Sequence, residues 1–94
     1  MNTENIDIKN ATIIDVRTPG EFMMGNVKGS KNIPLDEVSS RIEEFKSIEG
    51  NIVLCCASGG RSGQVTILLQ QNGIPNVYNG GGWQTVKALR LLSF

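Results

Sequence analysis

Apolar runs alternate along the chain with amphipathic segments, and this alternation predicts strands followed by helices. The run Ala11–Val16 is rich in β-branched residues, and Ile52–Cys55 is continuously apolar, as expected of buried strands. Three shorter segments are also predicted to be extended: Ile6–Ile8 as an edge strand, Lys31–Pro34 and Asn76–Asn79. Strands that alternate with helices indicate an α/β fold, in which helices cover both faces of a parallel sheet.

The helices are indicated by apolar residues at helical spacing and by residues typical of helix ends. Thr18–Glu21 has the pattern of a capping box with proline at the first helical position, which predicts a short helix ending near Gly25. Three further helices are predicted over Asp36–Lys46, Gln64–Gln71 and Trp83–Leu92. In the last of these helices, Val86, Leu89 and Leu92 should face the core.

Three turns follow strands directly and should therefore lie at one edge of the sheet. They are Arg17–Gly25, Cys56–Arg61 and Gly80–Trp83, with Gly80–Gly82 expected to form a mobile loop. Ligands of parallel α/β sheets bind outside the carboxyl ends of the strands. The functional site is predicted there. Asp15 and Arg17 are expected to hold the first turn together by hydrogen bonds and an ion pair.

Composition and charge exclude several classes of function. The 94 residues fit one domain spanning residues 1–94, and nine basic residues balance nine acidic ones without a basic block, which disfavours nucleic-acid binding. The longest apolar run, Ile52–Ala57, is far shorter than the roughly 20 residues of a membrane helix. Met1–Asp7 carries acidic residues and no apolar core, unlike a signal peptide. We therefore expect a soluble, cytoplasmic protein without a membrane partner.

The chain contains two adjacent cysteines and no histidine, which restricts the available chemistry. Two neighbouring cysteines are too few and too close for a disulfide framework or a structural zinc site. The lack of histidine removes Cys–His and Ser–His catalytic pairs and most zinc and iron ligand sets. We therefore expect neither a bound metal nor another cofactor.

Cys56 stands at the start of a glycine-rich turn, where a thiol can become reactive without a histidine. Backbone N–H groups of such a turn, and the positive end of the helix that follows, favour the thiolate over the thiol. Arg61 adds a fixed positive charge to the loop, and the alternative is that it is only an ion-pair partner at the surface. Cys55, inside the strand, is expected to be a small core residue.

Several motifs resemble those of rhodanese-like domains. Ile14–Phe22 followed by Gly25–Leu35 resembles the N-terminal signature of the family, and Cys56–Ser62 resembles its active-site loop. Val77–Trp83 is similar to its closing strand, loop and helix, so the resemblance covers nearly the whole chain in the right order. It implies a five-stranded parallel sheet flanked by helices on both faces, and a single-domain sulfurtransferase.

The resemblance also implies roles for individual residues of the loop. Cys56 would be the nucleophile and Arg61 the loop arginine, both catalytic. The substrate-binding residues, whose backbone would hold the sulfur, are Ala57, Ser58, Gly59, Gly60 and Ser62. The implied reaction moves sulfane sulfur from a small-molecule donor, thiosulfate or a persulfide, to cyanide, a thiol or a protein acceptor through a Cys56 persulfide.

The chain departs from the family pattern at three positions. Asn26 stands where members usually have histidine, and Ser30 where they often have alanine. Ala57 stands where many thiosulfate-using members carry a basic side chain. Because Arg61 is then the only charged residue of the loop, this third departure favours a persulfide donor over thiosulfate.

Two other functions fit the same motifs. Counted from Cys55, five residues precede Arg61, which is the pattern of tyrosine phosphatases and of phosphatases and arsenate reductases on the rhodanese-like fold. Against this interpretation, the expected glycine three residues after the nucleophile is Gly59 only when counted from Cys56, and Leu54 replaces the usual histidine. The third function is that of a non-catalytic binding module, but such modules commonly lose the cysteine or the arginine that this chain retains.

Overall fold

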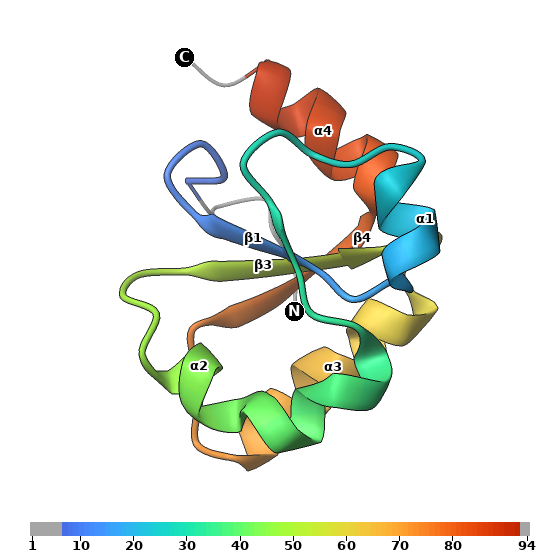
Figure 1. Cartoon of the computed structure of the whole chain (residues 1–94). Helices are drawn as coiled ribbons and strands as arrows, with labels where there is room; N and C mark the ends of the chain where they lie inside the picture. The colour runs from blue at the N-terminus through green and yellow to red at the C-terminus, as the bar shows by residue number, and fades with distance from the viewer. Residues whose placement is uncertain (1–6, 93–94) are drawn as a thin grey trace.

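The structure is a computed structural model that describes residues 7–92 (Figure 1). Its elements in chain order are β1 (Thr12–Asp15), α1 (Pro19–Met23), β2 (Lys31–Asn32), the 3-10 helix η1 (Leu35–Arg41), α2 (Ile42–Lys46), β3 (Ile52–Cys56), α3 (Gly60–Gln71), β4 (Val77–Gly82) and α4 (Trp83–Leu91). The predicted α/β class is confirmed, because strands and helices alternate. Among residues 7–92, no helix is long and apolar enough to cross a membrane.

The strands form a parallel sheet in the order β2-β1-β3-β4. Four strands are present among the described residues, rather than the five that were predicted. Of the expected edge strand Ile6–Ile8, Ile6 lies outside the described residues. Ile8 belongs to a turn in which the N–H groups of Asn10 and Ala11 both donate to the Asp7 carbonyl. The backbone of residues 8–10 thus forms a turn instead of pairing in the sheet.

Each face of the sheet has its own apolar cluster, because successive residues of a strand point to opposite faces. On one face, η1, α2 and α3 cover a cluster that includes Ile14, Leu54 and Phe45 (Figure 1). On the other face, α4 covers a smaller cluster that includes Ile13 and Val53. The prediction that helices cover both faces is therefore confirmed.

Two helices differ in their bounds from the sequence-based prediction. The helix expected over Asp36–Lys46 is divided into η1 and α2, because the backbone of Arg41 (φ −123°, ψ 25°) departs from helical geometry. Both parts still bury an apolar residue, Val38 and Phe45, so the apolar pattern does not distinguish one helix from two. Helix α3 begins at Gly60 rather than Gln64, so the last three of the seven residues of the loop Cys56–Ser62 lie in the first helical turn.

The glycine run Gly80–Gly82 was predicted to be a mobile loop, but it is the end of β4. A Cβ atom at Gly80 would lie 2.6 Å from Val53 Cγ1 and 2.7 Å from Val86 Cγ2. Glycine therefore allows β4 to pass close to β3 and α4. In α4, Val86 is buried as predicted, whereas Leu89 and Leu92 are exposed rather than inward because the adjoining apolar cluster reaches only the first turns of the helix.

Candidate active site

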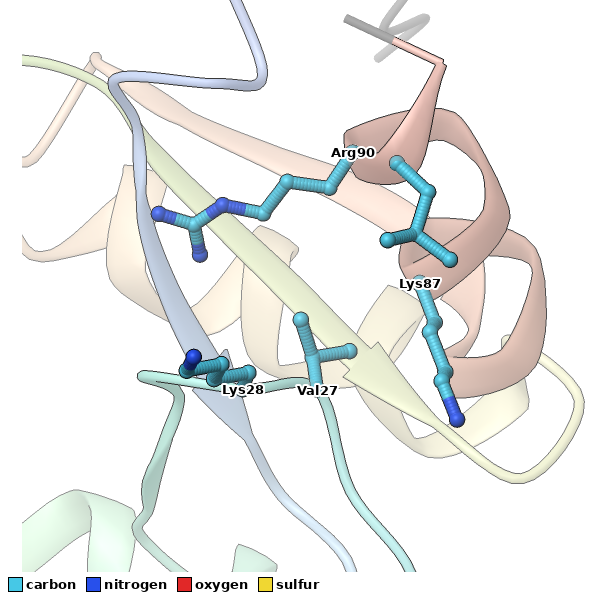
Figure 2. Close-up of a pocket in the computed structure, with 5 residues that line it drawn as sticks. Val27, Lys28, Lys87 and Arg90 are labelled. Atoms are coloured by element: carbon cyan, nitrogen blue, oxygen red, sulfur yellow. The ribbon is translucent and has the colours of Figure 1, made fainter.

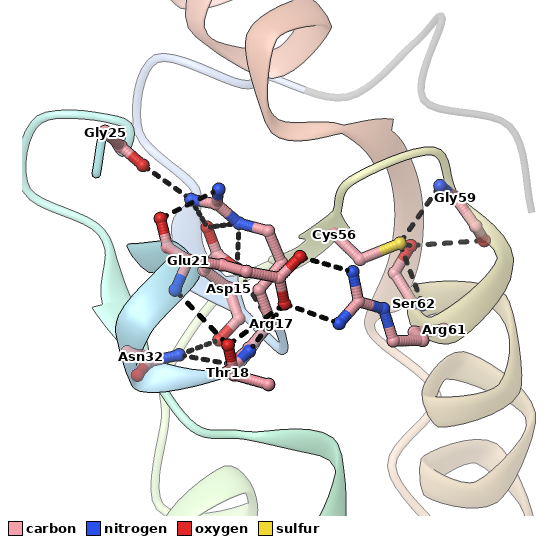
Figure 3. A network of polar contacts seen from close by, with 10 residues as sticks. All are labelled: Asp15, Arg17, Thr18, Glu21, Gly25, Asn32, Cys56, Gly59, Arg61 and Ser62. Carbon is pink, nitrogen blue, oxygen red and sulfur yellow. Dashed lines mark hydrogen bonds and ion pairs between the residues drawn. The ribbon is translucent and has the colours of Figure 1, made fainter. Parts of the chain in front are cut away.

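The turns after β1 and β3 meet the end of β4 at the carboxyl edge of the sheet, where the sequence predicted three turns. The loop after β3 is joined to α1 by an ion pair between Arg61 and Glu21, with Nη1 and Oε1 2.7 Å apart. The same loop is joined to β4 by a 2.7 Å hydrogen bond between Ser62 Oγ and Asn79 Oδ1. Figure 3 shows Glu21, Arg61 and Ser62 with Cys56.

The thiol of Cys56 lies in a cradle of hydrogen-bond donors. Cys56 is the last residue of β3, is 1% exposed and faces the side of the sheet that α3 covers. Its Sγ accepts hydrogen bonds from the backbone N–H of Gly59 at 3.0 Å and of Ser62 at 3.5 Å (Figure 3). The Ser62 hydroxyl lies 3.4 Å from the same atom. A sulfur so placed is surrounded by donors on the side where α3 begins.

These donors make Cys56 more acidic than an ordinary thiol. Burial raises its pKa, but hydrogen bonds from the Ser62 hydroxyl and from the N–H groups of Ser62, Ser58 and Gly59 outweigh burial. They lower the pKa from 9.0 to about 7. A large share of this side chain is thus thiolate, the nucleophilic form, at neutral pH.

Cys55 has the opposite environment. It is fully buried in the cluster between β3 and α4, on the other face of the sheet from Cys56. Burial, followed by the nearby carboxylate of Asp15, raises the pKa of the Cys55 thiol to about 12. A thiol that stays protonated at neutral pH is a poor nucleophile. The interpretation of Cys55 as a core residue is therefore supported by both its packing and its acidity.

The turn of the loop depends on Gly59. This residue adopts the left-handed conformation (φ 102°), and a Cβ atom there would lie 3.3 Å from Gly81 Cα. Glycine adopts this conformation without steric cost. Together, the backbone conformation and the close approach of β4 turn the Gly59 N–H toward Sγ.

The remaining predicted loop residues are placed differently. Ala57, Ser58 and Gly60 are exposed, whereas Ser62 is buried against Cys56. Of the three exposed residues, Ser58 contributes its backbone N–H to the lowered pKa of Cys56. A contribution of Ala57 and Gly60 to substrate binding stays a prediction.

The side chain of Arg61 is held by Glu21, so the loop cation is an ion-pair partner in this structure. Arg61 Nη1 and Nη2 lie 2.7 and 3.0 Å from the two carboxylate oxygens of Glu21. Glu21 is the last residue of the predicted capping box, in which the Thr18 N–H also donates to it at 3.0 Å. The hydrogen bond from Arg61, followed by that from Thr18, lowers the pKa of Glu21 to about 2. The capping box is confirmed, and its carboxylate also positions the loop arginine.

Asn79 is a site residue that the sequence analysis placed only in a strand. Its Oδ1 accepts from the Gly81 N–H at 2.9 Å, and its Nδ2 donates to the Gly59 carbonyl at 3.1 Å. The single hydrogen of the Ser62 hydroxyl is shared between Asn79 Oδ1 at 2.7 Å and Cys56 Sγ at 3.4 Å, so it donates to one of these acceptors at a time. Asn79 thus fixes both ends of the sulfur cradle to β4. Because its partners lie up to 20 residues away, no local sequence motif could have indicated this role.

Asp15 and Arg17 hold the first turn together, as predicted. Both are buried, and Arg17 Nη2 lies 2.7 Å from Asp15 Oδ2. The same nitrogen donates to the Gly25 carbonyl at 2.6 Å, and the guanidinium stacks 4.7 Å from the centre of the Trp83 ring. This pair therefore connects β1, the turn after α1 and the start of α4.

Comparison with known proteins gives a consistent set of similarities. The family model of the rhodanese-like domain matches residues 2–89. The chain is 37% identical over 71 residues to the uncharacterised protein YqhL of Bacillus subtilis, covering 76% of this chain and only 56% of that protein. It is 36% identical over 74 residues to the thiosulfate sulfurtransferase PspE of Escherichia coli, covering 78% of this chain and 71% of that protein.

Solved structures show the same similarity in three dimensions. A structure described as rhodanese with anions, from E. coli, has a TM-score of 0.72 and 34% identity, covering 80% of this chain and 89% of the other. A human single-domain sulfurtransferase has a TM-score of 0.70 and 26% identity, covering 85% of this chain and 81% of the other. Both similarities include most of each chain.

Proposed function

This chain belongs to the rhodanese-like domain family, and from that premise we propose that it is a sulfurtransferase whose sulfur-carrying residue is Cys56. The observation that carries the proposal is the cradle of N–H and hydroxyl donors around Cys56 Sγ, which lowers the pKa of this thiol to about 7. The similarity to named sulfurtransferases supports the same class of reaction. A histidine base is unnecessary where the thiolate already exists.

The proposed reaction has two steps at one sulfur atom. The Cys56 thiolate attacks the outer sulfur of the donor; a new S–S bond forms as the donor bond breaks, and sulfite or a thiolate leaves with the electron pair. An acceptor thiolate or cyanide then attacks the outer sulfur of the Cys56 persulfide and releases the thiolate again. Such alternation between two enzyme forms gives ping-pong kinetics.

The donor cradle would stabilise the negative sulfur in both steps. Preorganised N–H groups interact with an anion at little reorganisation cost, and the loss of one such donor typically costs about 3 kcal/mol of transition-state stabilisation. Here Gly59 and Ser62 supply the N–H groups, and Asn79 holds both residues in place. Ala57, Ser58 and Gly60 complete the proposed substrate-binding loop.

We further propose that a persulfide is a better donor than thiosulfate. The loop carries no cation at Ala57, and the charge of Arg61 is balanced by the Glu21 carboxylate. A dianion such as thiosulfate would approach that carboxylate as well as the arginine, whereas the S–S group of a thiol persulfide carries at most one negative charge. The name of PspE makes thiosulfate the natural reference donor for comparison.

The test is mass spectrometry of reduced protein treated with thiosulfate or with glutathione persulfide, together with an assay of sulfur transfer to cyanide. Wild type and Cys55→Ala should gain the mass of one sulfur atom on Cys56 and transfer it, while Cys56→Ser should do neither. The ratio kcat/KM should be higher with the persulfide. Full transfer by Cys56→Ser would overturn the proposal, and failure of wild type to take up sulfur would favour a non-catalytic binding module.

The phosphatase interpretation has less support from the geometry. It needs Cys55 as the nucleophile, but Cys55 is fully buried on the opposite face from the donor cradle, and its thiol has a pKa of about 12. Hydrolysis of p-nitrophenyl phosphate that persists in Cys56→Ser and disappears in Cys55→Ala would reverse this conclusion.

A further inference from the structure

The basic residues of this protein differ in whether a carboxylate of residues 7–92 contacts them. Five of the nine form ion pairs with carboxylates: Arg17, Lys31, Arg41, Lys46 and Arg61. The other four make no ion pair with any carboxylate of residues 7–92: Lys9, Lys28, Lys87 and Arg90. The charge of these four residues is therefore not balanced by a contacting carboxylate among residues 7–92.

Three of these four cations gather around one cavity. Lys28, Lys87 and Arg90 line a cavity of about 390 Å³ beside α4 (Figure 2). The backbone of the fourth residue, Lys9, is held beside them, because the Arg90 guanidinium donates to its carbonyl at 3.2 Å. The cavity volume lies within the range of about 300–1,000 Å³ that is common for ligand pockets. The positive charge is therefore concentrated at a concave surface.

The cavity also offers apolar contact. It is lined by Val27, which is buried, and by Leu91, which is 72% exposed at the end of α4. Figure 2 shows Val27 between the side chains of Lys28 and Lys87. We call this set, Val27, Lys28, Lys87, Arg90 and Leu91, the α4 cavity. Its chemistry fits a carboxylate with an apolar neighbour.

The α4 cavity approaches the carboxyl edge of the sheet through Trp83. Lys87 Nζ lies 5.9 Å from the ring centre of Trp83, the residue at which α4 leaves the carboxyl edge of the sheet. Gly25 lies against the same ring, since a Cβ there would be 2.9 Å from Trp83 Cη2, and the two residues before it, Met23 at the end of α1 and Met24, are 83% and 90% exposed. Exposed methionines are common at adaptable binding surfaces. One partner could therefore contact the cavity and the sulfur site together.

The opposite face of the molecule is acidic, which favours approach of an acidic partner from the α4 side. Residues 31–49, which include η1 and α2, carry five carboxylates and three cations. They cover the other face of the sheet from α4. An acidic partner is thus attracted to the α4 side and repelled from the α2 side, an arrangement that steers association.

We propose that the α4 cavity is the docking site for an acidic segment of the protein that exchanges sulfur with Cys56. A carboxylate of that segment interacts with Lys87 and Arg90, and an apolar neighbour contacts Val27 and Leu91. The docked partner covers the exposed methionines, which a small anion would leave in water. This proposal rests on the proposed function, because it assigns the partner of that same site.

The probe is a pair of synthetic cysteine peptides used as sulfur acceptors. One peptide carries a run of glutamates and a leucine beside its cysteine, and the other has glutamines in place of the glutamates. Sulfur release from persulfidated protein should show a KM about tenfold lower for the glutamate peptide, and the difference should shrink as salt is added. The kcat should be similar, because docking lies outside the donor cradle.

Charge variants test whether the preference for the glutamate peptide depends on the α4 cavity. The double variant Lys87→Glu with Arg90→Glu should lose the preference for the glutamate peptide, and the milder Lys28→Gln with Lys87→Gln should reduce it. The matched control, Lys31→Glu with Lys46→Glu, changes the same charge on the opposite face and should retain it. Transfer to cyanide should be equal in all of these proteins, which checks folding and the Cys56 site independently.

Two results would overturn the docking site while leaving the proposed function intact. They are equal KM values for the two peptides in wild type, and a preference for the glutamate peptide that survives charge reversal of Lys87 and Arg90. Loss of cyanide transfer in wild type would instead count against the proposed function itself.

Discussion

The two neighbouring cysteines differ in acidity because consecutive residues of a strand face opposite layers. Cys55 enters the apolar cluster under α4, where burial raises its pKa to about 12. Cys56 meets the first turn of α3, whose N–H groups and the Ser62 hydroxyl bring its pKa to about 7. The chain thereby separates one reactive thiol from one inert thiol without a histidine.

This difference predicts the pH dependence of alkylation. In Cys55→Ala, the rate at which iodoacetamide alkylates Cys56 should increase with pH, because only the thiolate reacts. The rate should be half-maximal near pH 7 and reach its plateau about two pH units higher. In Cys56→Ser, the remaining thiol should stay unmodified at pH 8 because its pKa is about 12. A midpoint near 9 in the first variant would show that the cradle does not stabilise the thiolate.

The Ser62 hydroxyl makes the largest favourable contribution to the acidity of Cys56. Ser62→Ala should therefore move the alkylation midpoint upward by up to about one pH unit, since the backbone N–H groups of Gly59 and Ser62 remain. Ser58→Ala is the matched control, because Ser58 acts through its backbone N–H and should leave the midpoint unchanged. Equal midpoints for wild type and Ser62→Ala would remove the hydroxyl from the cradle.

At the scale of elements, β4 supports the cradle from behind. Asn79 binds Ser62 and Gly59 through Oδ1 and Nδ2, so its side chain connects β4 to the start of α3. Asn79→Asp would retain the acceptor, lose the donor and place a negative charge near the sulfur. The alkylation midpoint of Cys56 should then rise, because a nearby like charge disfavours the thiolate. Asn76→Asp, at the opposite end of β4, should not move it.

The close packing of β4 gives a second prediction at this scale. Gly80→Ala places a Cβ within 2.6 Å of Val53 and 2.7 Å of Val86, so it should lower the free energy of unfolding by about 1–3 kcal/mol. Gly20→Ala is the control, since no atom lies within 4 Å of a Cβ in that position of α1. Gly20→Ala should be neutral or slightly stabilising. Urea unfolding of both variants measures the difference, and equal stability would show that β4 relaxes without cost.

The elements that could be predicted from the sequence are those with local signals. The capping box of Thr18 and Glu21 and the apolar run of β3 have the structure expected of their residues. The end of β4 could not be predicted, because a glycine run usually indicates a loop and only its pairing with β3 makes it a strand. Asn79 and the Glu21–Arg61 pair depend on contacts across 17 to 40 residues, which no local pattern records.

At the scale of the whole molecule, the two layers around the sheet have different roles. The layer of η1, α2 and α3 encloses Cys56 and supplies its donors through α3. The layer of α4 encloses Cys55 and adjoins the α4 cavity. Lys28, Lys87 and Arg90 of this cavity form no ion pair with a carboxylate of residues 7–92. The sheet separates these layers, and the turns at its carboxyl edge bring them together at one rim.

The acidity of Cys56 also couples the chemistry of one thiol to the stability of the whole fold. Its pKa is about 7 in the folded chain and near 9.0 when unfolded, so between these values the unfolded state binds more protons. Stability from this group is therefore fully present above pH 9 and is lost as pH falls through 7, a difference of about 2–3 kcal/mol.

Urea unfolding under reducing conditions at pH 6, 7, 8 and 9 tests this coupling. The stability of Cys55→Ala minus that of a Cys55→Ala, Cys56→Ser double variant should grow with pH across this range. The subtraction cancels the contributions of the other titrating groups to the pH dependence of stability. Both proteins also lack Cys55, whose raised pKa would change stability with pH in the opposite direction. A difference that stays constant from pH 6 to 9 would mean that the fold does not favour the thiolate, and the proposed sulfur chemistry would then lose its physical basis.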